Sequence, residues 1–187
     1  MSWLRQYGLV IVIAAIIGHA AFVYYYPRVL MDAAFERLSG RGAQANAWRR
    51  AERVSESSRT IVRPSPDLHY SACPYDLARG PLTLRVTAWP AYWSVSLYAA
   101  NSDNYFVLDD REAHDGADIT LVRAGRTPPE HAARVVFSPT QRGVALVRRL
   151  ASSVAEFDAA NAAARGDVCG RFQDTDGTGA KQRHGWR

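Results

Sequence analysis

The sequence predicts an α+β protein in which an N-terminal transmembrane helix is followed by an antiparallel, β-rich, sandwich-like domain that a C-terminal helix closes. Three observations support this prediction. Residues 6–27 form an apolar run without Asp, Glu, Lys or Arg. Apolar and polar side chains alternate within residues 80–108, a pattern typical of strands with one buried face. Ser153 and Glu156 have the spacing of a capping box at a helix start.

The uncharged run at residues 6–27 would form about 33 Å of helix, which is enough to cross a hydrocarbon core. Arg5 precedes it, Arg28 follows it, and the tyrosines at 24–26 end it as an interfacial aromatic belt would. A cleaved signal peptide is the alternative, because residues 18–20 resemble a small-x-small cleavage site. We favour a membrane anchor over residues 1–27, since the apolar run continues past that site into the tyrosines.

The charges that flank this anchor do not settle its orientation. Arg28, Arg37 and Arg41 outnumber Arg5, which by the positive-inside rule favours a cytoplasmic C-terminal side. Long domains, however, cross membranes largely regardless of these charges. His19 would lie within the membrane, where an ionisable group is a functional candidate. A lone neutral histidine that faces lipid or a helix partner is the simpler interpretation.

Residues 28–62 are predicted to form a helical juxtamembrane segment. Leu30, Ala34 and Leu38 share one face of a helix that leaves the membrane. Residues 44–55 form a plausible second helix, although that helix has little apolar face.

The β-rich domain is predicted over residues 63–169. Leu82, Leu84 and Val86 lie on one face of a first strand. A second strand has the apolar positions 93, 95, 97 and 99, and a third follows the turn at 101–104, so these strands are expected to form an antiparallel meander. Further strands are expected over residues 119–123, 135–137 and 143–150.

The final helix is predicted from Ser153 to about Arg165, with Gly166 as a left-handed C-terminal cap. The tail at 170–187 is rich in Gly, Asp and Thr and has no apolar period, so we expect it to be disordered.

The formal net charge of the 187-residue chain is +5, and Lys181 is its only lysine. Basic proteins often bind nucleic acid or anionic lipid. Here the arginines are scattered among acidic residues, without a basic helix or an aromatic-interleaved stripe. We therefore expect no nucleic-acid partner.

Several short motifs are similar to one known family. They are Pro-Asp-Leu-His-Tyr-Ser at 66–71, Tyr-Asp-Leu at 75–77, Gly-Pro-Leu at 80–82, Tyr-Trp-Ser-Val-Ser-Leu-Tyr at 92–98 and Val-Phe-Ser-Pro-Thr at 136–140. Over residues 63–164 the chain resembles family 1254 of the domains of unknown function, particularly its short membrane-anchored bacterial members. In longer relatives this domain precedes a second β-rich domain, family 1214. The resemblance implies a separately encoded partner that carries the family 1214 domain, or a reduced structural role.

Four side chains form the candidate ligand-binding set: Tyr70, Asp76, Trp93 and Tyr98. Several aromatic rings with one carboxylate are the usual lining of a small-molecule pocket. The alternative is that the aromatic rings fill the sheet core and Asp76 caps a turn before Leu77.

No catalytic or metal-binding constellation stands out. The carboxylates of Asp109, Asp110, Asp115 and Asp118 lack the alternating spacing of a calcium loop, so a solvated turn is favoured. The histidines form no close pair, and no Cys-x-x-Cys, nucleophile elbow or phosphate loop occurs. We expect no catalytic residue, no metal and no cofactor.

Cys73 and Cys169 are the two cysteines, one near each end of the predicted β-rich domain and neither with the apolar neighbours of a core cysteine. We predict a disulfide between them, although a cytosolic protein would keep two such thiols reduced. The bond would tie the C-terminal helix to the entrance of the sheet. It is also the main reason to place the domain in the periplasm, with one span in a bacterial inner membrane.

The expected function is that of a membrane-anchored envelope protein, a non-enzymatic binding or structural module that works with a partner protein. The alternative is a small-molecule-binding or enzyme subunit that uses an aromatic cleft around Tyr70 and Trp93.

Overall fold

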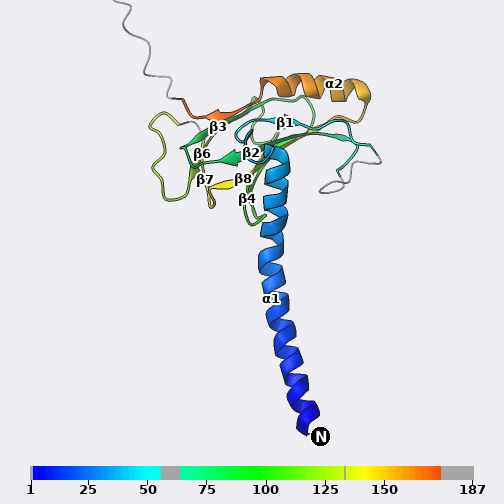
Figure 1. The fold of residues 1–187 in the computed structure, drawn as a ribbon. Helices are drawn as coiled ribbons and strands as arrows, with labels where there is room; N and C mark the ends of the chain where they lie inside the picture. Colours follow the sequence, from blue (N-terminus) through cyan, green and yellow to red (C-terminus); the bar gives the residue numbers. More distant parts are fainter. Residues whose placement is uncertain (1, 56–63, 133, 174–187) are drawn as a thin grey trace, which may run out of the picture.

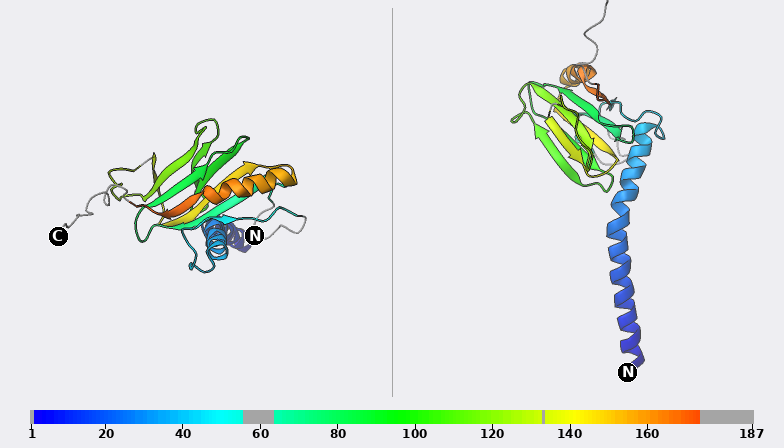
Figure 2. Two further views of the ribbon diagram at one scale, coloured as in Figure 1. Left: turned by 90° about the horizontal axis from the view of Figure 1, so that it is seen from above. Right: turned by 90° about the vertical axis from the view of Figure 1, so that its left-hand side faces the viewer.

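The computed structural model describes residues 2–55, 64–132 and 134–173. It begins with one long helix, α1 (Ser2–Ser39), that projects from a β-rich domain as a straight stalk (Figures 1 and 2). Residues 7–26 are exposed along their whole length. Within the described ranges, α1 is the one helix that is long and apolar enough to cross a membrane, and a signal sequence near the N-terminus would meet the same criteria.

The domain is a sandwich of two sheets, which confirms the predicted fold class. The first sheet has the order β1 (Arg49–Arg50), β2 (Leu68–Asp76), β8 (Arg142–Leu150), β4 (Trp93–Ala99), β5 (Asn104–Asp109), and its neighbours are all antiparallel. The second has the order β7 (Arg134–Ser138), β6 (Gly116–Arg123), β3 (Leu82–Thr87), β9 (Val168–Arg171). In it only the β6–β7 pair is parallel.

The core lies between the two sheets, where alternate strand residues meet. On β3, Leu82, Leu84 and Val86 are buried while the residues between them are not. On β4, Trp93 and Val95 are fully buried on the facing side. This period of two is what the sequence pattern predicted, because successive side chains of a strand point to opposite faces.

The last turns of α1 pack on the outer face of the first sheet, against β2 and β8. Phe35 is buried there, and the guanidinium carbon of Arg142 lies 5.3 Å from the centre of its ring. About two turns closer to the N-terminus of the helix, the Pro27 carbonyl accepts a hydrogen bond from the Ser102 hydroxyl at 2.9 Å. The predicted helix over residues 28–38 is therefore confirmed, and it is fastened to the domain.

The helix α2 (Val154–Ala163) lies across one end of the sandwich (Figure 1). Its predicted capping box is confirmed: the Glu156 N–H donates to Ser153 Oγ at 3.2 Å, and the Ser153 N–H donates to the Glu156 carboxylate at 2.9 Å. The hydrogen bond that the Ser153 N–H donates to the carboxylate is the largest of the effects that hold the pKa of Glu156 below its ordinary value.

The predicted left-handed cap at Gly166 is wrong. The short 3-10 helix η1 (Ala164–Gly166) follows α2, and Asp167 then continues in extended conformation into β9. A Cβ at Gly166 would lie 2.8 Å from Thr87 Oγ1, so close packing explains the glycine there.

Because Gly170 and Arg171 belong to β9, the disordered tail does not begin at 170 as predicted. Its remainder, residues 174–187, lies outside the described residues.

The predicted helix over residues 44–55 is also wrong. This segment forms a turn and then β1, in which Arg49 pairs with Ala72 of β2. The Asn46 side chain explains the outcome, since it accepts from the Asp76 N–H at 2.7 Å and donates to the Asp76 carbonyl at 3.1 Å. These contacts hold the segment along β2, and they are too distant in sequence to appear in a local helix pattern. Residues 56–62 of the predicted juxtamembrane segment lie outside the described residues.

The predicted meander requires one correction. The strand β3 pairs with β6 and β9, whereas β4 pairs with β5 and β8, so β3 and β4 belong to different sheets. The segment 88–92 carries the chain across, and Trp89 Nε1 anchors it by donating to the Leu150 carbonyl at 2.8 Å. A break at Pro90 marks a change of sheet here and not a hairpin turn.

Candidate functional site

The structure does not bring the four predicted ligand-binding residues into one cleft. Trp93 is fully buried on the core side of its sheet. Tyr70 and Asp76 lie in phase with each other on β2 and out of phase with the fully buried His69 and Cys73, which places them on the outer face. They also lie at opposite ends of that strand. Tyr98 lies on the outer face of β4. A ligand-binding role for these residues stays a prediction.

Asp76 has a local structural role. Its carboxylate accepts from the Ala78 N–H at 2.9 Å, which caps the turn after β2, and from Arg142 Nε at 2.9 Å and Gln141 Nε2 at 3.2 Å. Burial alone would raise the pKa of Asp76, but the hydrogen bonds from Ala78 and Arg142 outweigh it and lower the pKa. This geometry matches the turn-capping alternative.

The two outer tyrosines also have partners in the chain. The Tyr70 hydroxyl accepts from the Ser65 N–H at 2.9 Å, and the Tyr98 hydroxyl accepts from Arg148 Nη2 at 3.2 Å. Both contacts stabilise the outer face of the first sheet.

A buried polar cluster, which sequence analysis missed, lies at the α2 end of the sandwich. We call it the His69 cluster: His69, Trp93, Arg149 and Asp167. His69, Arg149 and Trp93 stand opposite one another across β2, β8 and β4. Arg149 Nη2 donates to Asp167 Oδ1 at 2.7 Å and to the Thr87 carbonyl at 3.1 Å. Neither the Arg149 nor the Asp167 side chain is exposed to solvent.

Many polar atoms in and beside this cluster have no hydrogen-bond partner within the part of the chain that the structure describes. These atoms are His69 Nδ1 and Nε2, Ser71 Oγ, Trp93 Nε1, Arg149 Nε and Nη1, and Asp167 Oδ2. A buried unpaired polar group costs free energy, and native proteins contain few of them. Their concentration at one end of the sandwich distinguishes this end as a candidate site.

His69 is held in its neutral form. Burial lowers its pKa, and the positive charge of Arg149 lowers it further, while Asn161 and Asp167 act in the opposite direction. The sequence did carry a signal for the cluster. His69 and Arg149 are in phase with the buried positions Cys73 and Val147 of their strands, so they occupy core positions that apolar residues would ordinarily fill.

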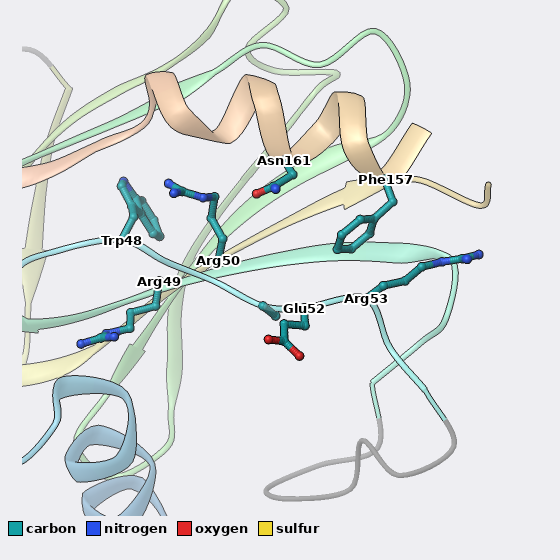
Figure 3. A pocket seen from close by; sticks show the side chains of 8 residues that line it. Trp48, Arg49, Arg50, Glu52, Arg53, Phe157 and Asn161 are labelled. Carbon is teal, nitrogen blue, oxygen red and sulfur yellow. The ribbon is translucent and has the colours of Figure 1, made fainter. Parts of the chain in front are cut away.

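An open pocket of about 530 Å³ adjoins the cluster, between residues 48–53 and α2 (Figure 3). The ring of Phe157, which lines the pocket, lies 5.0 Å from the His69 ring between centroids. Figure 3 shows Trp48, Arg50, Phe157 and Asn161 in the space between the segment and the helix, whereas Arg49 and Glu52 point to the other side of the segment. The lining residues are Trp48, Arg49, Arg50, Ala51, Glu52, Arg53, Phe157 and Asn161.

The opposite end of the sandwich holds a network of hydroxyl groups. The Tyr75 hydroxyl lies 2.9 Å from the Tyr105 hydroxyl and 3.0 Å from Ser138 Oγ, and it donates to the Tyr98 carbonyl at 3.1 Å. Burial raises the pKa of both Tyr75 and Tyr105. Each member has a partner, so the network is a closed structural feature.

Cys73 and Cys169 lie at disulfide distance, as predicted. Their sulfur atoms are 1.99 Å apart and their Cα atoms 6.6 Å apart. The pair joins β2 of the first sheet to β9 of the second. The prediction that Cys73 lacks the apolar neighbours of a core cysteine was wrong, because Cys73 is fully buried within the apolar core.

No group of three His, Cys, Asp or Glu side chains is placed to hold a metal ion among residues 2–55, 64–132 and 134–173. Of the acidic residues at 109–118, Asp109 accepts backbone hydrogen bonds from Arg111 and Glu112 within the turn after β5. The turn therefore uses this carboxylate for its own conformation.

The family model described as "Protein of unknown function (DUF1254)" matches residues 45–169, which is most of the chain. The chain belongs to the DUF1254 family. The match runs from the turn before β1 into β9, and it includes both cysteines, the His69 cluster and every residue that lines the pocket. These features therefore lie inside the DUF1254 domain, whereas α1 lies outside it.

Two solved structures resemble this DUF1254 protein. The crystal structure of the VPA0106 protein from Vibrio parahaemolyticus aligns with a TM-score of 0.62 and 14% identity over 79% of this chain and 36% of that chain. A putative uncharacterized protein from Burkholderia cenocepacia aligns with a TM-score of 0.46 and 17% identity, over 64% of this chain and 35% of that chain. No curated protein matches the chain. The likeness to VPA0106 shows the fold alone, and this chain spans about a third of that protein.

Proposed function

We propose that this protein is a membrane-anchored envelope protein whose β-rich domain acts outside the cytoplasm as a non-enzymatic binding module for a partner protein. The observation that carries the proposal is the structure of α1. Residues 7–26 are largely apolar and exposed, while Phe35 of the same helix is buried against the domain. An exposed apolar surface of this length is suited to a lipid environment, and the continuous helix would hold the domain at a fixed distance from it.

The proposed location is a bacterial inner membrane with one span and the domain in the periplasm. The support is the Cys73–Cys169 pair at disulfide distance, since disulfides form and persist in oxidising compartments. Trapping thiols with an alkylating reagent in intact cells, followed by non-reducing electrophoresis, tests the oxidation state. We expect both cysteines to resist alkylation until a reductant is added. Two freely alkylated thiols in envelope protein would contradict this location.

The proposed partner is a protein that carries the companion family 1214 domain. In support, this chain spans 36% of the VPA0106 protein, and the resemblance to longer relatives implies a family 1214 domain that works together with this one. We expect the protein to leave native membranes in mild detergent as a stoichiometric complex with such a chain. A tagged single-span protein from the same membranes is the control, and recovery of the protein alone in a monodisperse peak would contradict the partner.

The alternative, a small-molecule-binding or enzyme subunit with an aromatic cleft around Tyr70 and Trp93, has less support. These two side chains lie on opposite faces of the first sheet, and Trp93 is fully buried. A thermal shift with a small molecule that Asp76→Asn abolished would favour the alternative.

A further inference from the structure

We propose that the pocket between residues 48–53 and α2 binds a small organic acid that has one carboxylate and a flat apolar body. This site is separate from the partner-binding role and does not depend on it. The proposal follows from the charge of the lining, from the shape of its walls and from the unpaired polar atoms behind it.

The space under α2 contains a positive charge and hydrogen-bond donors. Arg50 points into it, whereas Arg49 and Glu52 point to the other side of the segment and do not contribute their charges to this space (Figure 3). Arg50 and Asn161 enter that space from opposite walls. Arg50 forms no ion pair with any residue in the described part of the chain. A guanidinium group offers a planar fork of donors that matches a carboxylate, so Arg50 is suited to bind one.

The walls of the pocket are flat and aromatic. The indole of Trp48 and the ring of Phe157 both border the space that Arg50 enters (Figure 3). The volume of about 530 Å³ lies within the range of small-molecule pockets. Aromatic faces stack on planar groups, which a bare inorganic anion lacks. The ligand is therefore an organic acid.

A second observation points to the same place. His69 is fully buried, and its ring contacts Phe157 in the pocket wall. Asn161 of the same wall is close enough to raise the pKa of His69, but its side chain does not reach hydrogen-bond geometry with either ring nitrogen. Trp48 Nε1, in the lining itself, is likewise buried without a partner. The wall of the pocket that carries Trp48 and Phe157 therefore borders buried polar atoms that the described part of the chain leaves without partners, a rare feature in native proteins.

The test uses the full chain in detergent and isothermal titration calorimetry, with titrations into empty micelles subtracted. The probes are 2-naphthoate, its neutral analogue 2-naphthamide, and inorganic phosphate. We expect 2-naphthoate to bind about tenfold or more tightly than either other probe, because only it combines a flat body with a charge-assisted hydrogen bond. Equal affinity for the amide, tighter binding of phosphate, or no binding of 2-naphthoate at millimolar concentration would overturn the proposal.

Two variants locate the site. Arg50→Gln is expected to weaken 2-naphthoate binding about tenfold, since it removes the charged partner. Arg49→Gln is the matched control: it removes the same charge from the adjacent position, whose side chain points the other way (Figure 3). Thermal unfolding of both variants checks that each is folded. Full affinity in Arg50→Gln, or an equal loss in Arg49→Gln, would refute the site.

Discussion

Arg149 and Asp167 form an ion pair in which Nη2 lies 2.7 Å from Oδ1 and neither side chain is exposed. The pair connects the two sheets. Arg149 belongs to β8, and Asp167 Oδ1 also accepts the N–H of Thr87, at the end of β3, at 2.9 Å. One carboxylate therefore fixes the position of β3, the approach of the chain to β9 and the buried arginine together.

Asp167→Asn is expected to lower the free energy of unfolding by about 3–5 kcal/mol, because it leaves Arg149 as an uncompensated buried charge. Urea unfolding of the detergent-solubilised chain measures the change. Asp118→Asn is the control, since the Arg85–Asp118 pair has similar geometry at 3.1 Å but side chains that are 56% and 46% exposed. We expect that substitution to cost no more than about 1 kcal/mol. Similar losses in the two variants would show that burial of the Arg149 pair does not matter.

Gly143→Ala is expected to destabilise the domain by about 3 kcal/mol or more, as overpacking of a tight core site does. A Cβ at this position would lie 2.2 Å from the Tyr75 hydroxyl oxygen and 2.2 Å from the Tyr98 carbonyl oxygen. Gly170→Ala is the matched control, because it also lies in a strand and a Cβ there would meet nothing within 4 Å. The same urea measurement applies, and an equal effect of the two substitutions would contradict the packing around Tyr75.

His69 is expected to make stability depend on pH below neutrality. Its pKa is lowered in the folded protein from an ordinary value of 6.5, so the unfolded chain binds the proton more readily. The contribution of His69 is therefore complete above pH 6.5 and is lost as the pH falls from there toward the lowered folded pKa.

The measurement is the difference in unfolding free energy between pH 7 and pH 5 for the wild type and for His69→Gln. The variant should lose less stability over this interval than the wild type, whatever its starting stability. His114→Gln, which removes an exposed histidine, should lose as much as the wild type. An unchanged pH dependence in His69→Gln would contradict the prediction.

Removing the cross-link between Cys73 and Cys169 is expected to cost about 4–5 kcal/mol, because the two residues are 96 apart in sequence and the closed loop is long. Urea unfolding with and without reductant measures the loss in the wild type. The control is the chain with both Cys73→Ala and Cys169→Ala, which should not respond to reductant. A wild type that is equally stable when fully reduced would show that the pair contributes nothing.

Much of the fold follows from local patterns in the sequence. The buried face of β3 was predicted correctly, since Leu82, Leu84 and Val86 alternate with polar positions. The start of α2 was predicted because Ser153 and Glu156 satisfy backbone donors within one turn of chain.

The strand β2 was missed, because Pro74 interrupts its apolar run. The Pro74 carbonyl accepts from the Asn46 N–H, so the side of Pro74 that lacks an N–H faces the segment before β1, which begins only at Arg49.

The candidate site could not be predicted in the same way. The pocket requires Trp48 and Arg50 to lie beside Phe157, more than a hundred residues away, and that contact depends on β1 pairing with β2. No local pattern specifies a pairing of only two residues. The four candidates Tyr70, Asp76, Trp93 and Tyr98 were grouped by residue type, and the alternation of strand side chains separates them onto two faces.

The orientation of the anchor is the most direct test of the account, because the domain is proposed to work outside the cytoplasm. Alkaline phosphatase, which is active only outside, and a fluorescent protein that folds only inside would each be fused after Gln173, beyond β9. We expect an active phosphatase and a dark fluorescent fusion at equal expression. An inactive phosphatase with a bright fluorescent fusion would place the domain in the cytoplasm, as the arginines after the span favour, and would contradict the account.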